Sequence, residues 1–587
     1  MEVIKSRSGF IFTLGICLLF CIACCVKAAT NFYTDEVEPY VFFICLYTLL
    51  TMFFIYAICY GSSKIRSSTS DGILLGALLL LLISKIFNYD RNDIVTIVSL
   101  IFLYFIIRSI GILKVHGFIY LICIIYLLEF ILLLYTSFQQ YTFESIKSHA
   151  VGTFYNSGLF AAFMIATIPF MEYLIRQQSA KVRTILRIIL AVTIIAVITL
   201  TMSRAALLSL IIVLAGMYSI YYPDKVMRLR CYFRKQKLKT YGLLVIIAVL
   251  LIALFYFKEN SSIGRILIWT ISIKEFIKKP IFGWGMGSFS QYFPDWQANY
   301  FSSITAQSRR FEFVADITYT AFNEFLQLLI ECGLVGFVIF ALFVRSIVSV
   351  KSQYPLLAGT FKICVISFLI EAIFSYPFHS FPILLLFFIS AALLNNLSSG
   401  NTRIINYSHK VRWAVCFVAL VFSFSSVVYF FKQLQYVNQW NANKRAAQDG
   451  DKQVLKNFSR LYLHLNHCGP FLVSYGEVLY DFGDYNNAIK ILKEAKSIMA
   501  NEEASYRLGE SYEKMKMNFQ AEKEYKYLSN LLPNHFRPKY HLANLYLTMG
   551  DTLGARNVAK KILAMPVKVP SETVSNIQEE MKYIISH

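Results

Sequence analysis

Charged residues are scarce in this sequence, and patterns that hold metals or disulfides are missing from it. Of the 587 residues only 16% are Asp, Glu, Lys or Arg, whereas 57% are hydrophobic. This balance excludes an ordinary soluble globular protein. No constellation of CxxC pairs occurs and the nine histidines are scattered, so we predict no structural zinc. Most of the 12 cysteines lie in apolar runs, and they predict no disulfide framework.

Acidic residues are the scarcer kind of charge: 35 Asp and Glu stand against 56 Lys and Arg, a formal net charge of +21. Such a balance can indicate nucleic-acid binding. Here, however, most cations lie in short segments between apolar runs, where they act as a topology signal in membrane proteins. We therefore expect no nucleic-acid partner.

Apolar runs of about 18 residues or more recur along residues 1–432. They predict transmembrane helices, because in lipid a single segment can satisfy its backbone polar groups only as a helix. We predict an all-α polytopic membrane domain with about thirteen spans, near residues 9–28, 40–60, 72–88, 93–112, 116–136, 152–175, 185–202, 205–222, 240–257, 322–345, 355–375, 380–397 and 412–431. The first run could be a cleaved signal peptide, since Lys5 and Arg7 precede it and VKAA follows it.

The loops between these spans alternate in charge. Segments 62–68, 176–187 and 223–239 are basic, and they alternate with segments 30–40 and 139–148. The positive-inside rule places the basic set in the cytoplasm. Counting spans from there predicts that the turn at residues 203–204, the large loop 258–321 and the tail after residue 431 are all external.

Two arginines in segments predicted to be external are candidates for binding an anionic group. Arg204 is the only formal charge from Ile188 to Tyr222, a run long enough that we expect it to break into two spans near Ser203 and Arg204. Arg204 could snorkel to the lipid headgroups, or it could hold an anionic group at the outer surface. Arg265 lies in IGRILIWTISIKEFI, whose apolar spacing predicts an amphipathic helix on the membrane surface, and could equally be a charge on its solvated face.

Polar residues cluster at the start of the span near 322–345. They are Asn323, Glu324, Gln327 and Glu331. The last three are spaced i, i+3 and i+7, which places them on one helical face. Ionisable residues within spans usually face a bundle interior or a wet cavity.

Four segments occur in the order found in the O-antigen ligase and polymerase superfamily, which this chain resembles over about residues 152–397. They are GTFYNSGLFAAFM (152–164), TMSRAALLSL (201–210), GRILIWT with KKPIFGWGMGSF (264–289) and NEFLQLLIECGLVGF (323–337). The resemblance implies a GT-C-like helix bundle that transfers a glycan from undecaprenyl pyrophosphate to an acceptor, without a metal or other cofactor. It implies a multi-pass protein of the bacterial inner (cytoplasmic) membrane, acting on the periplasmic side in lipopolysaccharide or surface-polysaccharide biosynthesis. The acceptor could be the lipid A core, another glycan or a protein, so ligase, polymerase and protein O-oligosaccharyltransferase all remain open.

The resemblance gives the polar residues candidate roles. Arg204 and Arg265 would bind the donor pyrophosphate, because a guanidinium offers phosphate a two-donor fork and stays charged. Ser203, Asn323 and Gln327 would support the site. Family members often carry a histidine before the asparagine of NEFLQ, where this chain has Phe322. We therefore predict that His379, at the next external turn, is the base, although it could be only an interface histidine. The other candidates are Asp316, Glu324 and Glu331.

The composition changes after the last span. Gly476, Gly509 and Ala543 recur with a period close to the ~34 residues of the tetratricopeptide repeat, and Ala488, Ala521 and Ala555 follow them by twelve positions each. Residues 433–587 are therefore predicted to form a periplasmic tetratricopeptide-type α-solenoid. Its concave face could hold a partner protein or an acceptor, or the domain could be only a spacer.

A second class of function is a non-enzymatic transporter or assembly scaffold. Transporters with inverted repeats show internal symmetry and helices interrupted at the midplane. This sequence shows neither, and its polar features gather at the predicted outer surface. These features favour an enzyme.

Overall fold

The structure, a computed structural model, describes residues 38–60, 64–84, 91–110, 115–142, 152–154, 156–236, 258–303, 309–399, 403–406 and 408–586, with isolated residues elsewhere. It divides into two compact units. The first contains Met1–Leu254 and Phe322–Leu434, and the second contains Phe255–Ala321 and Gln435–His587. The large predicted loop thus groups with the C-terminal residues.

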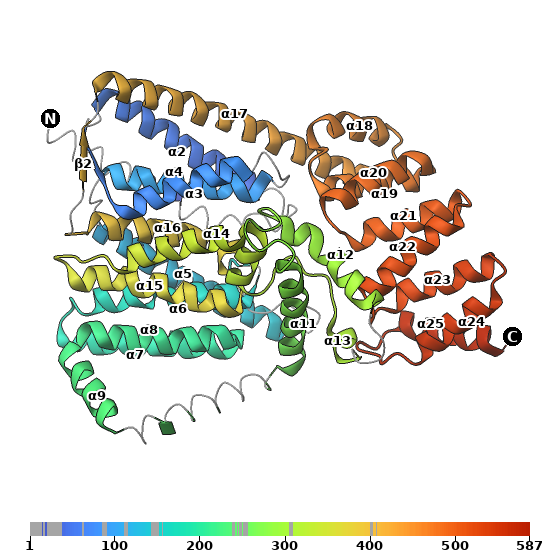
Figure 1. Cartoon of the computed structure of the whole chain (residues 1–587), viewed down its shortest axis with the longest axis horizontal. Coiled ribbons are helices and arrows are strands. Elements are labelled where there is room, and N and C mark those ends of the chain that lie inside the picture. The colour runs from blue at the N-terminus through green and yellow to red at the C-terminus, as the bar shows by residue number, and fades with distance from the viewer. Residues whose placement is uncertain are drawn as a thin grey trace. The chain divides into compact units, whose positions relative to one another are not determined.

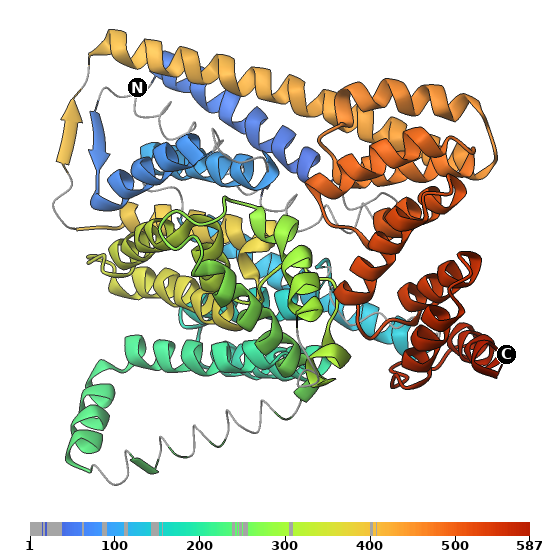
Figure 2. The same ribbon diagram turned by 45° about the vertical axis from the view of Figure 1, so that its right-hand side comes forward.

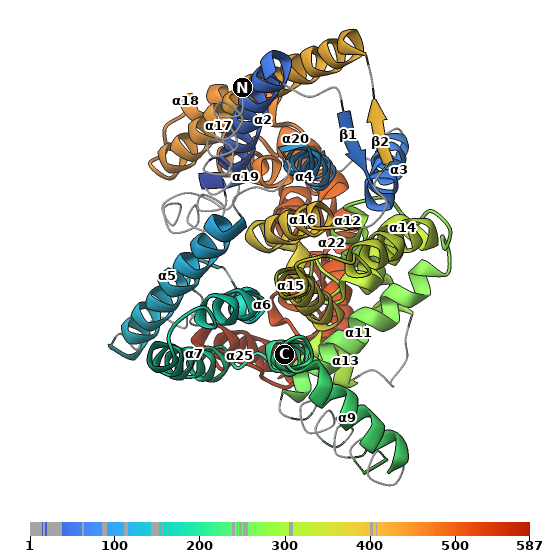
Figure 3. The same cartoon turned by 90° about the vertical axis from the view of Figure 1, so that its left-hand side faces the viewer.

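The first unit is helical apart from one pair of short strands. Its elements are α2 (Glu38–Tyr60), β1 (Lys64–Ser67), α3 (Thr69–Ser84), α4 (Arg91–Ile110), α5 (Val115–Thr142), α6 (Ser157–Ile175), α7 (Ala180–Thr201), α8 (Arg204–Tyr221), α9 (Pro223–Lys235), α14 (Glu324–Val348), α15 (Pro355–Phe374), η1 (Pro377–His379), α16 (Phe381–Asn396), β2 (Arg403–Asn406) and the first part of α17 (His409–Gln448) (Figure 1). The strands are antiparallel, with Lys64 opposite Asn406 (Figure 3).

Eight helices in the described ranges are long and apolar enough to cross a membrane: α2, α5, α6, α7, α8, α14, α15 and α17. Two shorter apolar helices, Val95–Arg108 within α4 and Phe381–Asn396, match two further predicted spans. The predicted spans near 9–28 and 240–257 lie mostly outside the described residues. The chain is therefore a multi-pass membrane protein by its helices, and a total of about thirteen spans stays a prediction.

Helices α6, α8 and α15 form the tightly packed centre of the first unit, and Figure 3 looks nearly along α6 and α15. Small residues let α8 and α15 approach closely. The hydroxyls of Ser209 and Ser367 share a hydrogen bond of 2.7 Å, and a Cβ on Gly359 would lie 2.4 Å from the Ile220 side chain. Such small-residue contacts are typical of membrane helix pairs. The pairing is antiparallel, so the first turn of α8 lies level with the last turn of α15.

Aromatic rings attach the outer helices α2 and α17 to each other, and Figure 2 shows the two helices side by side. The rings of Phe43 and Phe430 stack at 4.8 Å between centroids, and those of Tyr47 and Phe430 at 5.6 Å. Rings bury large areas and prefer offset or tilted contacts, so they help to hold the two apolar helices together.

Contacts between loops define two ends of the first unit. At one end β1 pairs with β2, and the Ser399 N–H donates to the Lys351 carbonyl at 2.9 Å. At the other end the Phe378 N–H donates to Glu324 at 2.7 Å. The end that carries the strands includes the basic segment 62–68. The assignment of the other end to the outside rests on the positive-inside rule and stays a prediction.

A buried ion pair lies at the end that carries the strands. Asp71 accepts hydrogen bonds from Arg108 (2.9 and 3.1 Å), from the Tyr104 hydroxyl (2.8 Å) and from the Ser68 N–H (2.7 Å). The Asp71 and Arg108 side chains are only 8% and 6% exposed. The Ser68 contact caps the first turn of α3, and the other bonds tie α3 to α4.

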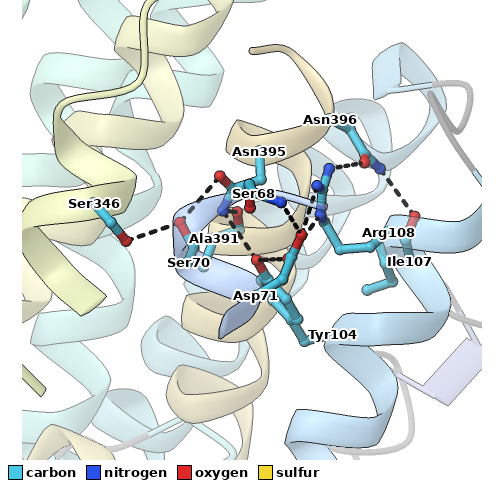
Figure 4. Close-up of polar contacts among 10 residues, drawn as sticks. All are labelled: Ser68, Ser70, Asp71, Tyr104, Ile107, Arg108, Ser346, Ala391, Asn395 and Asn396. Carbon is cyan, nitrogen blue, oxygen red and sulfur yellow. Dashed lines mark hydrogen bonds and ion pairs between the residues drawn. The ribbon is translucent and has the colours of Figure 1, made fainter. Parts of the chain in front are cut away.

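Amide and hydroxyl groups extend this cluster to two more helices (Figure 4). Arg108 donates to Asn396 at 2.7 Å, and Asn395 donates to the Tyr104 hydroxyl at 3.0 Å. Ser346 of α14 donates to Ser70 at 2.8 Å. The cluster therefore fastens α3, α4, α14 and α16 at the end opposite Glu324.

Replacing Asp71 by Asn should lower the stability of the full chain by roughly 3 kcal/mol or more, because Arg108 would stay buried without its counter-ion. The double variant Asp71→Asn/Arg108→Gln should recover most of this loss. Thermal unfolding of the purified protein in detergent measures both. Glu172→Gln is the control, since its partners Arg176 and Arg187 are 28% and 41% exposed and can be solvated without it. If the single and double variants lost equal stability, Asp71 would not stabilise the protein by compensating the charge of Arg108.

The second unit is built from the large loop and the C-terminal helices. The loop supplies α11 (Glu259–Phe276), α12 (Ser288–Ser302) and α13 (Arg309–Val314). The C-terminal part supplies the end of α17, α18 (Gln453–Leu465), α19 (Gly469–Asp481), α20 (Tyr485–Ile498), α21 (Glu502–Lys514), α22 (Asn518–Leu531), α23 (Phe536–Thr548), α24 (Thr552–Leu563) and α25 (Glu572–Ser586).

Neighbouring C-terminal helices pack as hairpins: α19 with α20, α21 with α22, and α23 with α24. The paired helices approach each other closely at the small residues of the predicted repeat. A Cβ on Gly476 would lie 2.4 Å from Leu492, and one on Gly509 would lie 2.5 Å from Tyr525. The repeating hairpins are those that the spacing of small residues predicts, and their assignment to the tetratricopeptide family stays a prediction.

The loop is fastened to these hairpins by hydrogen bonds. Gln297 donates to the Leu531 carbonyl at 2.8 Å, and Asn534 donates to the carbonyls of Phe313 and Ala315 at 2.8 and 2.9 Å. Buried Ala298, Leu531 and Leu532 form an apolar cluster beneath these bonds. Segments bonded so directly lie on the same side of a membrane, as the sequence predicted for both.

Candidate active site

The predicted polar residues at the start of α14 meet the turn between α15 and α16. Asn323 precedes α14 in an extended conformation, and its side chain accepts the Leu326 N–H at 3.0 Å as an N-cap. Phe322 before it has a φ of +50°, an unusual backbone for a bulky residue. Its ring meets the edge of the Tyr376 ring at 5.2 Å. The position that often holds a histidine is thus occupied by a ring packed on the turn that carries His379.

Glu324 orients this turn. One of its carboxylate oxygens accepts the Phe378 N–H at 2.7 Å and lies 3.2 Å from Nδ1 of His379. The Glu324 side chain is 10% exposed and that of His379 is 30% exposed. An ionised carboxylate only accepts hydrogen bonds, so this contact assigns the proton to Nδ1 and the lone pair to Nε2. A carboxylate bonded in this way fixes the ring and stabilises the imidazolium form.

Gln327 and Glu331 continue the chain of polar groups. The Gln327 amide nitrogen lies 3.1 Å from Nε2 of His379 and 3.1 Å from a carboxylate oxygen of Glu331. The amide has two hydrogens, so it can donate to both. The predicted common face of Glu324, Gln327 and Glu331 is confirmed, and it is the face that meets His379.

Arg204 begins a helix, as the long apolar run predicted. α7 ends at Thr201, Met202 has a φ of +47°, and the Ser203 hydroxyl accepts the Ala206 N–H at 3.3 Å as the N-cap of α8. A Cβ on Gly158 would lie 3.9 Å from that hydroxyl, so the first turns of α6 and α8 are neighbours. The positive ends of both helix dipoles thus lie beside half-buried Arg204.

Arg204 and His379 lie at the same end of the first unit. The antiparallel pairing of α8 with α15 brings the start of α8 level with the end of α15, from which η1 and His379 follow directly. Arg204, Ser203, Asn323, Glu324, Gln327 and His379 therefore share this end.

Sequence reasoning missed Glu129. This residue of α5 is 2% exposed, and its carboxylate accepts both the N–H (3.1 Å) and the hydroxyl of Thr153. Gly152 before it has a φ of +57°, and a Cβ there would lie 2.5 Å from the carboxylate. Glu129 thus holds the turn that leads to Asn156, the N-cap of α6. The available signal was a lone carboxylate inside an apolar run.

Arg265 and Asp316 belong to the second unit. Arg265 is half-buried on α11, and its neighbour Gly264 lies against Val314 of α13. Asp316 is exposed, and its carboxylate accepts the Ile317 N–H at 2.8 Å. Because Arg204 and His379 belong to the first unit, a joint site with either residue stays a prediction. No group of three or more His, Cys, Asp or Glu side chains in the described ranges is placed to hold a metal.

Comparison with known protein families supports the family resemblance that the sequence motifs indicate. Residues 189–341 match the family model described as O-Antigen ligase. The matched range includes Arg204, Arg265 and Glu324, and it ends before His379. No curated protein matches the sequence. The family match supports a membrane glycosyltransferase of the O-antigen ligase or polymerase type.

Proposed function

We propose that this chain transfers a glycan from undecaprenyl pyrophosphate to an acceptor at the periplasmic face of the bacterial inner membrane. The observation that carries the proposal is the pairing of His379 with Glu324 at the helix end that it shares with Arg204. The family match over residues 189–341 supports the reaction class. The alternation of basic loops supports the periplasmic placement.

The proposed step is a displacement at the anomeric carbon of the donor sugar. The acceptor hydroxyl forms a new carbon–oxygen bond as the bond from that carbon to the pyrophosphate oxygen breaks. The hydroxyl proton passes to Nε2 of His379, and undecaprenyl pyrophosphate leaves with the bonding electrons. Glu324 then stabilises the imidazolium.

Gln327 sets a condition on this step. Its amide faces the lone pair of Nε2 that the acceptor hydroxyl would use. The Gln327 side chain must therefore turn aside when the acceptor binds. Its second contact, with Glu331, offers the amide a partner when it does so. Gln327 would then keep the base occupied until an acceptor is present.

Arg204 would hold the departing pyrophosphate. It lies beside the N-terminal turns of α6 and α8, whose unpaired N–H groups and dipoles favour an anion. In the proposal Arg265 supplies the second guanidinium from the large loop. Two arginines would neutralise the charge that grows on the leaving group.

Deleting the encoding gene tests the proposed function and identifies the class of acceptor. Loss of glycan-capped lipid A core would identify a ligase, loss of long chains alone a polymerase, and loss of glycoprotein a protein glycosyltransferase. Analysis of surface glycans and glycoproteins before and after complementation measures all three. An unchanged glycan profile in every fraction would contradict the proposed function.

His379→Ala should lower transfer from a lipid-linked donor by roughly 10²-fold or more, the usual contribution of a general base. Glu324→Gln should cause a smaller loss, because glutamine still accepts the Phe378 N–H but does not stabilise an imidazolium. The control is His116→Ala, a histidine of α5 that contacts Tyr173. Transfer in vitro by equal amounts of folded protein is the readout. Near-normal activity of His379→Ala would remove this residue from the mechanism.

Arg204→Lys and Arg265→Lys should both stay impaired, because lysine keeps the charge but loses the two-donor fork. A charged hydrogen bond contributes about 1.5–3 kcal/mol, so each variant should lose roughly tenfold or more in transfer. Arg183→Lys is the control, since Arg183 bonds a backbone carbonyl at the exposed turn before α7. If lysine restored full activity at both positions, Arg204 would be a membrane anchor and the pyrophosphate clamp would be wrong.

A further inference from the structure

A hollow lies within the second unit between α12 of the loop and α22 of the C-terminal hairpins, which pack side by side (Figure 1). Its volume is about 390 Å³, within the range of small-ligand pockets. The residues that line it are Ala298, Asn299, Ser302, Phe519, Glu522, Lys523, Lys526, Tyr527 and Asn530. None of them is used by the proposed transfer step.

Two amide side chains face this hollow from different parts of the chain. Asn299 comes from α12 and Asn530 from α22. Across the part of the chain that the structure describes, neither amide group has a protein hydrogen-bond partner. An amide offers two donors and an acceptor, so the pair is available to a ligand rich in hydroxyl groups.

Aromatic rings supply the apolar part of the hollow. The Phe519 side chain is 75% exposed, although it is one of the largest apolar side chains of α22. Tyr527 adds a second ring, which is held in place by its hydrogen bond to Asp295 at 2.8 Å. The exposed ring of Phe519 next to amide groups matches the alternating C–H faces and hydroxyl edges of a sugar.

The charged residues of the hollow are largely paired. Glu522 accepts from Lys526 at 2.5 Å and from the Tyr546 hydroxyl at 2.7 Å. These two donors hold the pKa of the Glu522 carboxyl below its usual range. Lys523 is left as a single further cation at the rim, which is too little for a strongly charged ligand such as a free diphosphate.

We propose that this hollow binds a stretch of the glycan chain, at sugars remote from the one that reacts. The inference rests on the proposed function, because it takes its ligand class from the glycan that the enzyme would transfer. The loop and the hairpins each contribute one amide, so the site is complete only while they are docked. The C-terminal repeats would therefore bind substrate rather than serve as a spacer.

The repeat itself provides a matched control. Phe519 is the second residue of α22, and Leu553 is the second residue of α24 in the next hairpin. Leu553 is also highly exposed, at 70%, but it does not line the hollow. Removing either side chain exposes no core, so both alanine variants should fold.

The probe is the water-soluble glycan released by mild acid from the surface polysaccharide of the producing bacterium. Its binding to the full-length protein in detergent is measured by titration calorimetry. Phe519→Ala and Asn530→Ala should each weaken binding by about tenfold, the loss of one ring or amide contact. Leu553→Ala should bind as the wild type does, and Phe519→Tyr should retain binding because it keeps the ring.

The Arg204→Lys variant distinguishes the proposed glycan site from the proposed transfer function. The released glycan has no pyrophosphate, so this variant should bind it normally even where transfer is impaired. Unchanged affinity in Phe519→Ala and Asn530→Ala would overturn the glycan site, as would the absence of binding to a wild-type protein that transfers glycan. Binding at this hollow by a protein with no transferase activity would instead contradict the proposed function alone.

Discussion

Within lipid, every backbone N–H and C=O must be satisfied by the chain itself, and this constraint decides where chemistry can be placed in the first unit. The buried residues of α6 and α15 are mostly apolar, although they include Glu172 of α6 and Glu371 of α15. Other polar groups gather where helices begin, because the first turn of a helix leaves N–H groups unpaired. Asn156, Ser203 and Asn323 cap three such turns. Arg204 and Glu324, two of the residues proposed to act on the glycan donor or acceptor, directly follow two of these caps.

The two ends of the first unit are polar for different reasons. One end carries the buried Asp71–Arg108 pair, in which the charges compensate each other and the hydrogen bonds are largely internal. A cluster of this kind fastens helices and has little capacity left for a ligand. The other end carries helix N-termini, Arg204 and the Glu324–His379 pair. The positive ends of the helix dipoles and the Arg204 guanidinium there favour an anionic donor.

The second unit changes the role expected of the C-terminal repeats. Sequence alone left them as a partner-binding module or a spacer. The hydrogen bonds from Gln297 and Asn534 show that the repeats bind the chain's own loop, and this loop contains Arg265 and Asp316. A loop of this length would be costly to order by itself, since each ordered residue loses about 1–2 kcal/mol of backbone entropy. Docking to a rigid stack of hairpins offsets that cost before any substrate binds.

Local sequence determined the helices, the break at Ser203–Arg204, the shared face of Glu324, Gln327 and Glu331, and the period of the C-terminal hairpins. Each follows from apolar run length, from 3.6-residue periodicity or from a repeat, all of which act over short distances along the chain. The buried carboxylates Asp71 and Glu129 were not predicted from the sequence. The distant partners of the polar residues were not predicted either. Arg108 meets Asn396 across 288 positions, Glu324 meets His379 across 55, and Gln297 meets Leu531 across 234. Only the tertiary structure decides such pairs, because packing of distant helices, and no local pattern, brings their atoms within hydrogen-bonding distance.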